Sequence, residues 1–195
     1  MRVSRAQAEE NRERVITVAS RLFREHGFDG IGLKDLMKGA GLTQGGFYKQ
    51  FASKDDLAAL ASRRALESAT RRWSAAAADT SDPLEAVIRF YLSKDHSGEK
   101  AEGCPLVALG SDAARQTAEV RRPFEDGIRA HFEVLEEMIG ESDGTAVADK
   151  AMAILSMMVG AVMLSRIIED KELSSGVLDS AASEVRRIAG RDVSA

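Results

Sequence analysis

Cysteine and proline are nearly missing from this chain, whose 195 residues include one Cys and three Pro. A single cysteine excludes an internal disulfide framework and fits a reducing compartment. Segments in which β-branched and polar residues alternate are also lacking, whereas apolar residues recur at helical spacing. The sequence therefore predicts an almost wholly α-helical protein without disulfides.

Patterns for metal binding and catalysis are equally scarce. The three histidines, His26, His96 and His131, lie far apart, and no His-x-x-x-His or Cys-x-x-Cys spacing occurs. The glycine-containing segments do not match the phosphate-binding pattern of a P-loop. We therefore expect no enzyme, no metal site and no cofactor.

One long apolar run covers residues 151–168, but it contains Ser156, Ser165 and Arg166 and is rich in Ala and Gly. This composition favours a buried helix over a membrane span. The charged N-terminal segment also lacks the apolar core of a signal peptide. The sequence thus predicts a cytoplasmic protein.

The net charge of −4 hides an asymmetry along the chain. Residues 1–75 hold 14 Lys and Arg against nine Asp and Glu, whereas the remainder holds 13 against 22. A basic N-terminal part on an acidic remainder suggests that the N-terminal part meets a polyanion.

Apolar periodicity, caps and breakers predict a series of helices separated by short connections. Ser53 and Asp56 form a variant capping box at the start of one long helix. The segment 93–103 is expected to be a polar loop. The predicted helices cover residues 8–26, 33–40, a short segment after Thr43, 53–77, 84–92, 105–116, 118–139, 145–168 and 174–189.

The segment GLTQGGFYKQF, residues 41–51, predicts a helix-turn-helix with the helix before it. Gly41 stands where a left-handed residue ends a helix, and Thr43 is a good N-cap for the next one. Phe47 and Phe51 are four residues apart and should face inward, so Tyr48 and its neighbours point elsewhere. Two short helices joined by a tight turn place the second in a DNA major groove.

Two adjacent glycines, Gly45 and Gly46, open this second helix although each costs a helix about 1 kcal/mol relative to alanine. One reason to keep them is that DNA approaches the backbone more closely than a Cβ would permit. The free N–H groups and the positive dipole end of the helix would then face phosphates and bases. The alternative is a plain turn followed by a core aromatic pair.

Residues 15–60 resemble the tetracycline-repressor (TetR/AcrR) family of bacterial transcription regulators, on the stretch VITVASRLFREHGFDGIGLKDLMKGAGLTQGGFYKQFASKDDLAAL. The resemblance implies a helix-turn-helix DNA-binding domain over residues 1–52. It implies an effector-binding and dimerisation domain over residues 53–195. A homodimeric repressor of this kind binds a near-palindromic operator and is released by a small molecule.

Matching positions of the family motif imply which residues contact double-stranded DNA. Phosphate contacts fall on Thr43, Tyr48, Lys49 and Lys54, and base contacts on Gln44 and the glycine backbone. Two departures matter: Gly32 replaces a frequent capping threonine, and Gly46 replaces a small hydroxyl residue, so base readout relies more on Gln44 and DNA shape. The full DNA-binding set is Lys34, Thr43, Gln44, Gly45, Gly46, Tyr48, Lys49 and Lys54.

Aromatic and methionine residues of the second domain are candidates for an effector pocket, although most of them must be core. The set comprises Trp73, Phe90, Tyr91, Cys104, Phe124 and Met157. Cys104 precedes Pro105, which favours the first helical position, so the thiol lies at a helix N-terminus where its pKa falls. This resembles Gly-Cys segments of thiol-sensing family members; the alternative is an inert, half-buried cysteine.

Two further readings stay open: an electrophile-sensing repressor acting through Cys104, and an architectural DNA-binding protein without an effector. The architectural protein would need no large second domain.

An isologous four-helix dimer interface is predicted from two helices near the end of the chain: the run 151–168, which is apolar on nearly every face, and the helix 174–189, which carries an apolar stripe. The stripe consists of Leu178, Ala181, Ala182, Val185 and Ile188.

Overall fold

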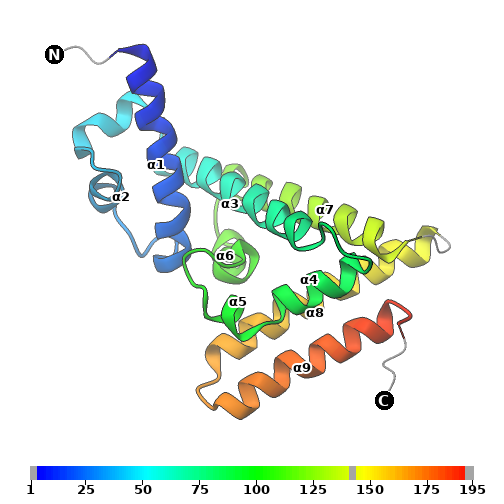
Figure 1. Cartoon of the computed structure of the whole chain (residues 1–195). Helices are drawn as coiled ribbons and strands as arrows, with labels where there is room; N and C mark the ends of the chain where they lie inside the picture. The colour runs from blue at the N-terminus through cyan, green and yellow to red at the C-terminus, as the bar shows by residue number, and fades with distance from the viewer. Residues whose placement is uncertain (1–3, 141–143, 192–195) are drawn as a thin grey trace. The chain divides into compact units, whose positions relative to one another are not determined.

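The computed structural model describes residues 4–140 and 144–191, which form helices and connections with no strand among them (Figure 1). The predicted all-helical class is confirmed. Within these residues the helices are α1 Arg5–His26, α2 Leu33–Gly39, η1 Gln44–Lys49, α3 Lys54–Ala76, α4 Pro83–Tyr91, α5 Lys94–Gly98, α6 Pro105–Ala113, α7 Ala118–Ile139, α8 Gly144–Ile167 and α9 Lys171–Ile188.

Packing divides the chain into two compact units. The first unit contains the chain up to Ser68 together with Lys100–Asp126, and the second contains Ala69–Glu99 together with the chain from Gly127 onward. The helices α3 and α7 each contribute to both units. The predicted boundary between residues 52 and 53 is a division by function, and it stays a prediction.

Helix starts differ from the predicted ones where a polar cap lies upstream of the apolar pattern. The Ser4 side chain accepts a hydrogen bond from the Gln7 N–H at 3.1 Å, so α1 begins at Arg5 rather than near residue 8. Asp170 accepts from the N–H groups of Glu172 and Leu173, and α9 begins three residues earlier than predicted. Caps extend a helix by satisfying its first N–H groups, which apolar periodicity does not register.

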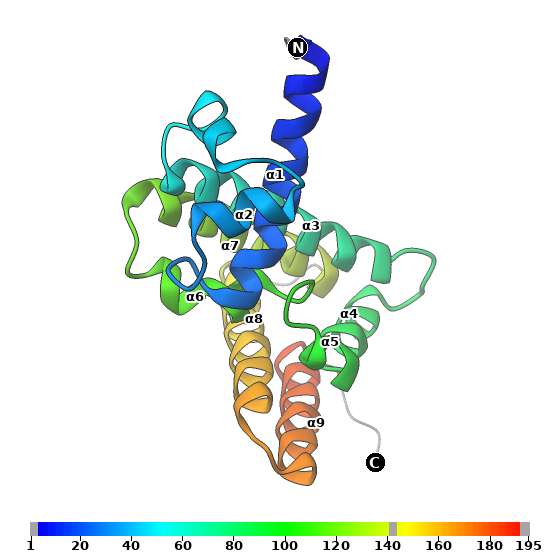
Figure 2. The same ribbon diagram turned by 90° about the vertical axis from the view of Figure 1, so that its left-hand side faces the viewer.

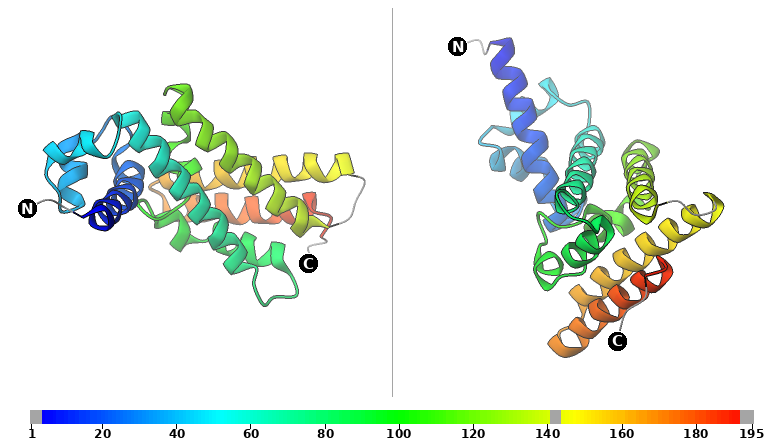
Figure 3. Two further views of the ribbon diagram at one scale, coloured as in Figure 1. Left: turned by 90° about the horizontal axis from the view of Figure 1, so that it is seen from above. Right: turned by 45° about the vertical axis from the view of Figure 1, so that its right-hand side comes forward.

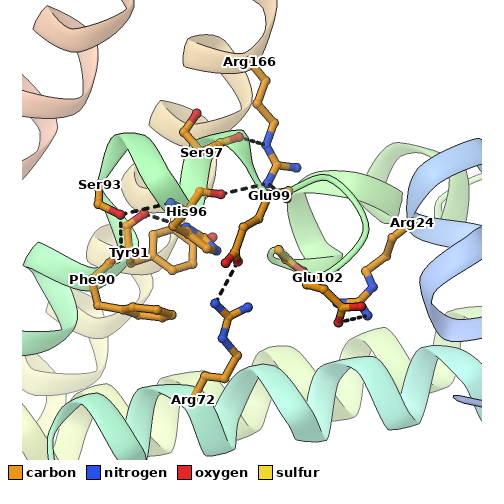
Figure 4. A network of polar contacts seen from close by, with 11 residues as sticks. Arg24, Arg72, Phe90, Tyr91, Ser93, His96, Ser97, Glu99, Glu102 and Arg166 are labelled. Atoms are coloured by element: carbon orange, nitrogen blue, oxygen red, sulfur yellow. Dashed lines mark hydrogen bonds and ion pairs between the residues drawn. The ribbon is translucent and has the colours of Figure 1, made fainter.

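A buried arginine ties α1 to the segment before α6 in the first unit. Arg24 donates from Nε to the Ser20 carbonyl at 2.9 Å and from Nη1 to the Gly103 carbonyl at 3.0 Å. Its Nη2 lies 3.5 Å from a Glu102 carboxylate oxygen (Figure 4). The charged guanidinium can be buried here because its Nε, Nη1 and Nη2 atoms each have an oxygen acceptor nearby.

The expected polar loop over residues 93–103 is wrong, because α5 lies within it. The Ser93 hydroxyl accepts from the His96 N–H at 3.1 Å and caps the helix start. Arg166 of α8 closes the other end, donating to the carbonyls of Ser97 at 2.8 Å and Glu99 at 2.7 Å (Figure 4). A five-residue helix is marginal alone, and this one depends on a side chain distant in sequence.

The helices α8 and α9 lie side by side along most of their length (Figures 2 and 3). Leu178, Ala181 and Val185 of α9 are buried within the chain. The predicted interface stripe is therefore corrected, since these three residues already pack inside one subunit.

By length and composition, Ala146–Ile167 of α8 is apolar enough to cross a membrane. Its residues Ala151, Ile154, Met158 and Val162 are buried within the chain. The core helix of a soluble protein passes the same test of length and hydropathy, so this feature is weak evidence for a membrane span.

The pair formed by Glu85 of α4 and Arg186 of α9 makes stability depend on pH. Arg186 donates to both carboxylate oxygens, at 2.8 and 2.9 Å, and this hydrogen bonding lowers the pKa of Glu85 from 4.5 to about 2. Folding therefore favours the ionised carboxylate. The resulting stabilisation is complete above pH 4.5 and is lost as the pH falls towards 2.

We expect Glu85→Gln to lower the free energy of unfolding by about 1 kcal/mol at neutral pH, a modest effect because the pair is partly solvated. The difference from wild type should shrink as the pH falls from 4.5 to 2. Urea denaturation at a series of pH values measures this. A difference that stays constant over that range would contradict the assigned pKa.

Candidate nucleic-acid interface

The turn between α2 and η1 is fixed by a Schellman motif. The Leu42 N–H donates to the Met37 carbonyl and the Gly41 N–H to the Lys38 carbonyl, both at 2.9 Å. Gly41 has φ +72°, the left-handed conformation that glycine adopts without strain. The prediction that Gly41 ends the preceding helix is confirmed.

The short helix predicted after the turn is present as η1, a 3-10 helix of six residues. Thr43 occupies the N-cap position in an extended conformation, but its side chain makes no capping hydrogen bond. A length of barely two turns favours this tighter form. The expected dipole effect is correspondingly weak, because few peptide units are aligned.

Two phenylalanines anchor η1 in the first unit. Phe47 and Phe51 are both buried, with ring centroids 5.4 Å apart, which confirms their inward orientation. The Arg12 guanidinium of α1 lies 5.4 Å from the Phe51 ring. These contacts hold the short helix firmly although its own hydrogen bonds are few.

The opposite side of η1 is polar and faces solvent. Tyr48 is 71% exposed and its ring stands edge-on to Phe47 at 5.1 Å. Gln44 and Lys49 are exposed, as is Lys34 on α2, whereas Gly46 and Lys54 are half-buried. A large exposed aromatic ring beside lysines is typical of a surface that contacts phosphate and sugar.

Neither glycine of η1 is required by the fold. Gly45 and Gly46 do not have positive φ angles. A Cβ on Gly45 would meet nothing within 4 Å, and one on Gly46 would reach only ordinary contact with Met37 at 3.8 Å and Gln50 at 4.0 Å. No neighbouring atom of the described chain therefore requires glycine at either position.

A groove of about 250 Å³ adjoins η1 and adds residues that sequence reasoning missed. Asn11 of α1 and Gln50 line it together with Thr43, Gly46 and Lys49. No local motif marks Asn11, because α1 meets the turn only through tertiary packing. Gly32, at the N-cap of α2, makes no side-chain cap, as its replacement of a threonine implied.

The start of α3 is set by the predicted capping box. The Asp56 N–H donates to the Ser53 hydroxyl at 3.0 Å, and the Asp56 carboxylate accepts from the Ala52 N–H at 2.9 Å. The reciprocal bond thus reaches one residue further back than in the usual box. It fixes Lys54 at the first position of α3, directly after η1.

The residues predicted for an effector pocket fall into separate places. Trp73, Phe90 and Tyr91 belong to the second unit, where Trp73 and Tyr91 are buried with ring centroids 5.4 Å apart. Phe124 packs against Phe28, 6.3 Å away, in the first unit. Met157 lines the outer groove between α8 and α9.

Cys104 stands at the N-cap of α6, as predicted from Pro105. Cys104 is only 3% exposed, and its side chain makes no capping hydrogen bond. A thiol reagent would reach it only after neighbouring side chains moved. Among the residues that the structure describes, no group of His, Cys, Asp or Glu is arranged to hold a metal ion.

The described residues combine a helix-turn-helix, anchored by buried phenylalanines, with a larger helical remainder. This architecture is typical of helix-turn-helix DNA-binding regulators. Residues 15–61 match the model of bacterial regulatory proteins of the tetR family. Over 162 residues, the chain is 26% identical to the HTH-type transcriptional regulator LmrA of Bacillus subtilis, covering 80% of this chain and 86% of LmrA.

Solved structures agree with these matches. A TetR transcriptional regulator from Chloroflexus aurantiacus superposes with a TM-score of 0.77 at 25% identity, covering 95% of both chains. The reduced form of E. coli NemR superposes with a TM-score of 0.77 at 20% identity, covering 91% of this chain and 96% of that one, and supports the fold alone. Residues 15–61 thus carry the DNA-binding helix-turn-helix domain of the tetR family, and the matches over the longer chain support a TetR-family transcriptional regulator.

Proposed function

We propose that this regulator is a cytoplasmic homodimeric repressor that leaves a near-palindromic operator when a small molecule binds its second domain. The observation that carries the DNA half is the η1 surface. No neighbouring atom requires glycine at its two adjacent glycine positions, and Gln44, Tyr48 and Lys49 are exposed beside them on a helix anchored by Phe47 and Phe51. The basic N-terminal part supports the same assignment.

The dimer is supported by an apolar groove of about 580 Å³ between the outer faces of α8 and α9. Leu164 is 48% exposed and Ile167 70% exposed, and Leu173 and Met163 add further exposed apolar surface. Small residues in the groove, Gly160 among them, allow a partner helix to approach closely. We assign this face to a second copy of the chain, so that two helices from each subunit pack together.

Symmetric subunits would present their two η1 helices to half-sites about 34–36 Å apart or a multiple of that distance. Selection of bound fragments from a random DNA pool tests this directly, followed by a screen for compounds that release the selected DNA. Recovery of an unsymmetric or random set of fragments would overturn the operator half of the proposal.

Lys49 separates phosphate contact from base readout. We expect Lys49→Ala to weaken binding to selected and to random DNA by about the same factor. The dependence of log affinity on log salt concentration should become less steep by about one unit, because one counterion fewer is released. Gln44→Ala should instead change base preference with little change in slope. Fluorescence anisotropy at several salt concentrations measures both. An unchanged affinity and slope for Lys49→Ala would remove this helix from the DNA surface.

A further inference from the structure

A chain of aromatic rings runs through the second unit, with one ring from each of four helices. The His131 ring of α7 stands edge-on to Trp73 of α3 with centroids 4.7 Å apart. Trp73 in turn meets Tyr91 of α4 at 5.4 Å, and Tyr91 meets His96 of α5 at 4.5 Å. Figure 4 shows Tyr91 and His96 at the end of this chain.

The protonation of His131 follows from its contacts. Its Nδ1 lies 2.6 Å from the Gly127 carbonyl oxygen, which can only accept, so Nδ1 carries the proton. Burial lowers the pKa of the His131 imidazole below its ordinary value of 6.5, so the ring is neutral at pH 7. Nε2 is therefore a hydrogen-bond acceptor.

This acceptor has no partner. His131 is 0% exposed, and its Nε2 makes no hydrogen bond with any residue that the structure describes. A buried polar atom left in this way costs about 1–3 kcal/mol, which a ligand that supplies a donor would recover. The fold holds the imidazole in one orientation through Gly127 and presents Nε2 beside the Trp73 ring.

We propose that His131 Nε2 anchors the effector, a neutral aromatic molecule with an O–H or N–H donor. This inference rests on the proposed release by a small molecule and names the chemistry of that molecule. Aromatic rings of Trp73 and Tyr91 on neighbouring helices favour a ring-shaped ligand. The donor is required because Nε2 can only accept.

Charge excludes the other ligand classes. Among the described residues no Asp or Glu side chain is buried, so a cationic ligand would find no counter-charge in this core. A carboxylate ligand would place its own lone pairs against the Nε2 lone pair. A neutral donor avoids both costs.

Binding must also displace packed side chains, since His131 is 0% and Trp73 1% exposed. A ring inserted beside Nε2 therefore shifts Trp73, which lies on α3, the helix that follows η1 in the chain. Trp73 is the single tryptophan, so its fluorescence reports on this site alone.

The test titrates the intact protein with 4-propylphenol and with 4-propylanisole, in which a methyl group replaces the donor proton. We expect a saturable change in Trp73 fluorescence and about tenfold tighter binding of the phenol, the value of one buried hydrogen bond. In ¹⁵N-histidine spectra, the Nε2 resonance of His131 should shift with the phenol. No saturable signal with the phenol, or equal affinity for the two probes, would overturn the proposal.

Two variants test whether the tighter binding of the phenol depends on His131. His131→Phe keeps a ring but removes the acceptor, so it should bind the two probes equally while its melting temperature stays the same or rises. Tyr91→Phe changes the other neighbour of Trp73 and should keep the tenfold preference. Should His131→Phe keep that preference, His131 is not the anchor; should it fail to fold, the histidine spectra of wild type decide.

Operator binding separates this inference from the proposed function. If screened compounds release operator from wild type and from His131→Phe equally, the small-molecule repressor stands and the His131 anchor is overturned. If the donor preference depends on His131 but the phenol leaves operator affinity unchanged, His131 binds a ligand that is not the effector, and the regulatory part is overturned.

Discussion

Gly45→Leu should abolish tight operator binding while leaving the fold unchanged. The φ angle of Gly45 is not positive and no atom lies within 4 Å of a Cβ built there, so leucine causes neither strain nor a clash within the chain. Any loss must then come from the DNA, which the proposed docking brings against this part of the backbone. We expect affinity to fall by about 100-fold, equivalent to about 2.7 kcal/mol.

Gly45→Ala provides an intermediate step, since a single methyl group should cost less than the leucine side chain. Gly98→Leu is the matched control, because Gly98 is also exposed and a Cβ there meets nothing within 4 Å. Circular dichroism melting curves of all variants should overlay, while anisotropy with operator DNA separates Gly45 from Gly98. Operator affinity within twofold of wild type for Gly45→Leu would show that DNA does not approach this backbone.

Much of the helix-turn-helix could be predicted from local sequence because local interactions determine it. Gly41 must accept a left-handed conformation, Phe47 and Phe51 must share a face, and Ser53 with Asp56 must cap the next helix. Each of these depends on residues fewer than six apart. The 3-10 geometry of the second helix could not be predicted, because apolar spacing hardly distinguishes a 3-10 turn from an α-turn over six residues.

Features that depend on distant residues could not be predicted in this way. The short helix α5 is completed by Arg166, nearly 70 residues later, and no pattern in the segment 93–103 announces that partner. In the sequence, His131 is an ordinary residue of an amphipathic helix, and only the structure shows that its ring contacts Trp73. The candidate DNA surface could be predicted from the sequence, whereas the arrangement of the proposed effector residues could not.

The same limit applies to the proposed dimer face, because periodicity indicated a stripe of α9 whose main residues pack within one subunit. Residues Leu178, Ala181 and Val185 form the more regular apolar stripe, and α8 of the same chain covers part of it. The groove proposed for a partner is lined by small and apolar residues around Leu164 and Leu173, interrupted by Ser180 and Glu184. A surface of such mixed composition has no clear apolar periodicity in the sequence, so it could not be predicted from the pattern.

Leu164→Glu should therefore convert the dimer into a folded monomer that binds operator weakly. Leu164 is 48% exposed in one subunit, so a glutamate there remains solvated in the monomer. In the proposed dimer the same carboxylate would be buried without a partner, and we expect subunit affinity to fall by at least about 100-fold. A monomer engages one half-site, so operator affinity should fall by roughly 100-fold or more through loss of bivalent binding.

Analytical ultracentrifugation at micromolar concentration measures the subunit affinity, and anisotropy with full and half operators measures the DNA binding. Leu164→Met keeps an apolar side chain of similar size and should remain dimeric. Ala114→Glu adds the same charge at an exposed position of the first unit and should leave both measurements unchanged. A dimeric Leu164→Glu protein with normal operator affinity would show that the α8–α9 groove is not the subunit interface. A monomeric variant with normal binding to the half operator and weak binding to the full one would instead establish that dimerisation through α8 and α9 supplies the operator affinity.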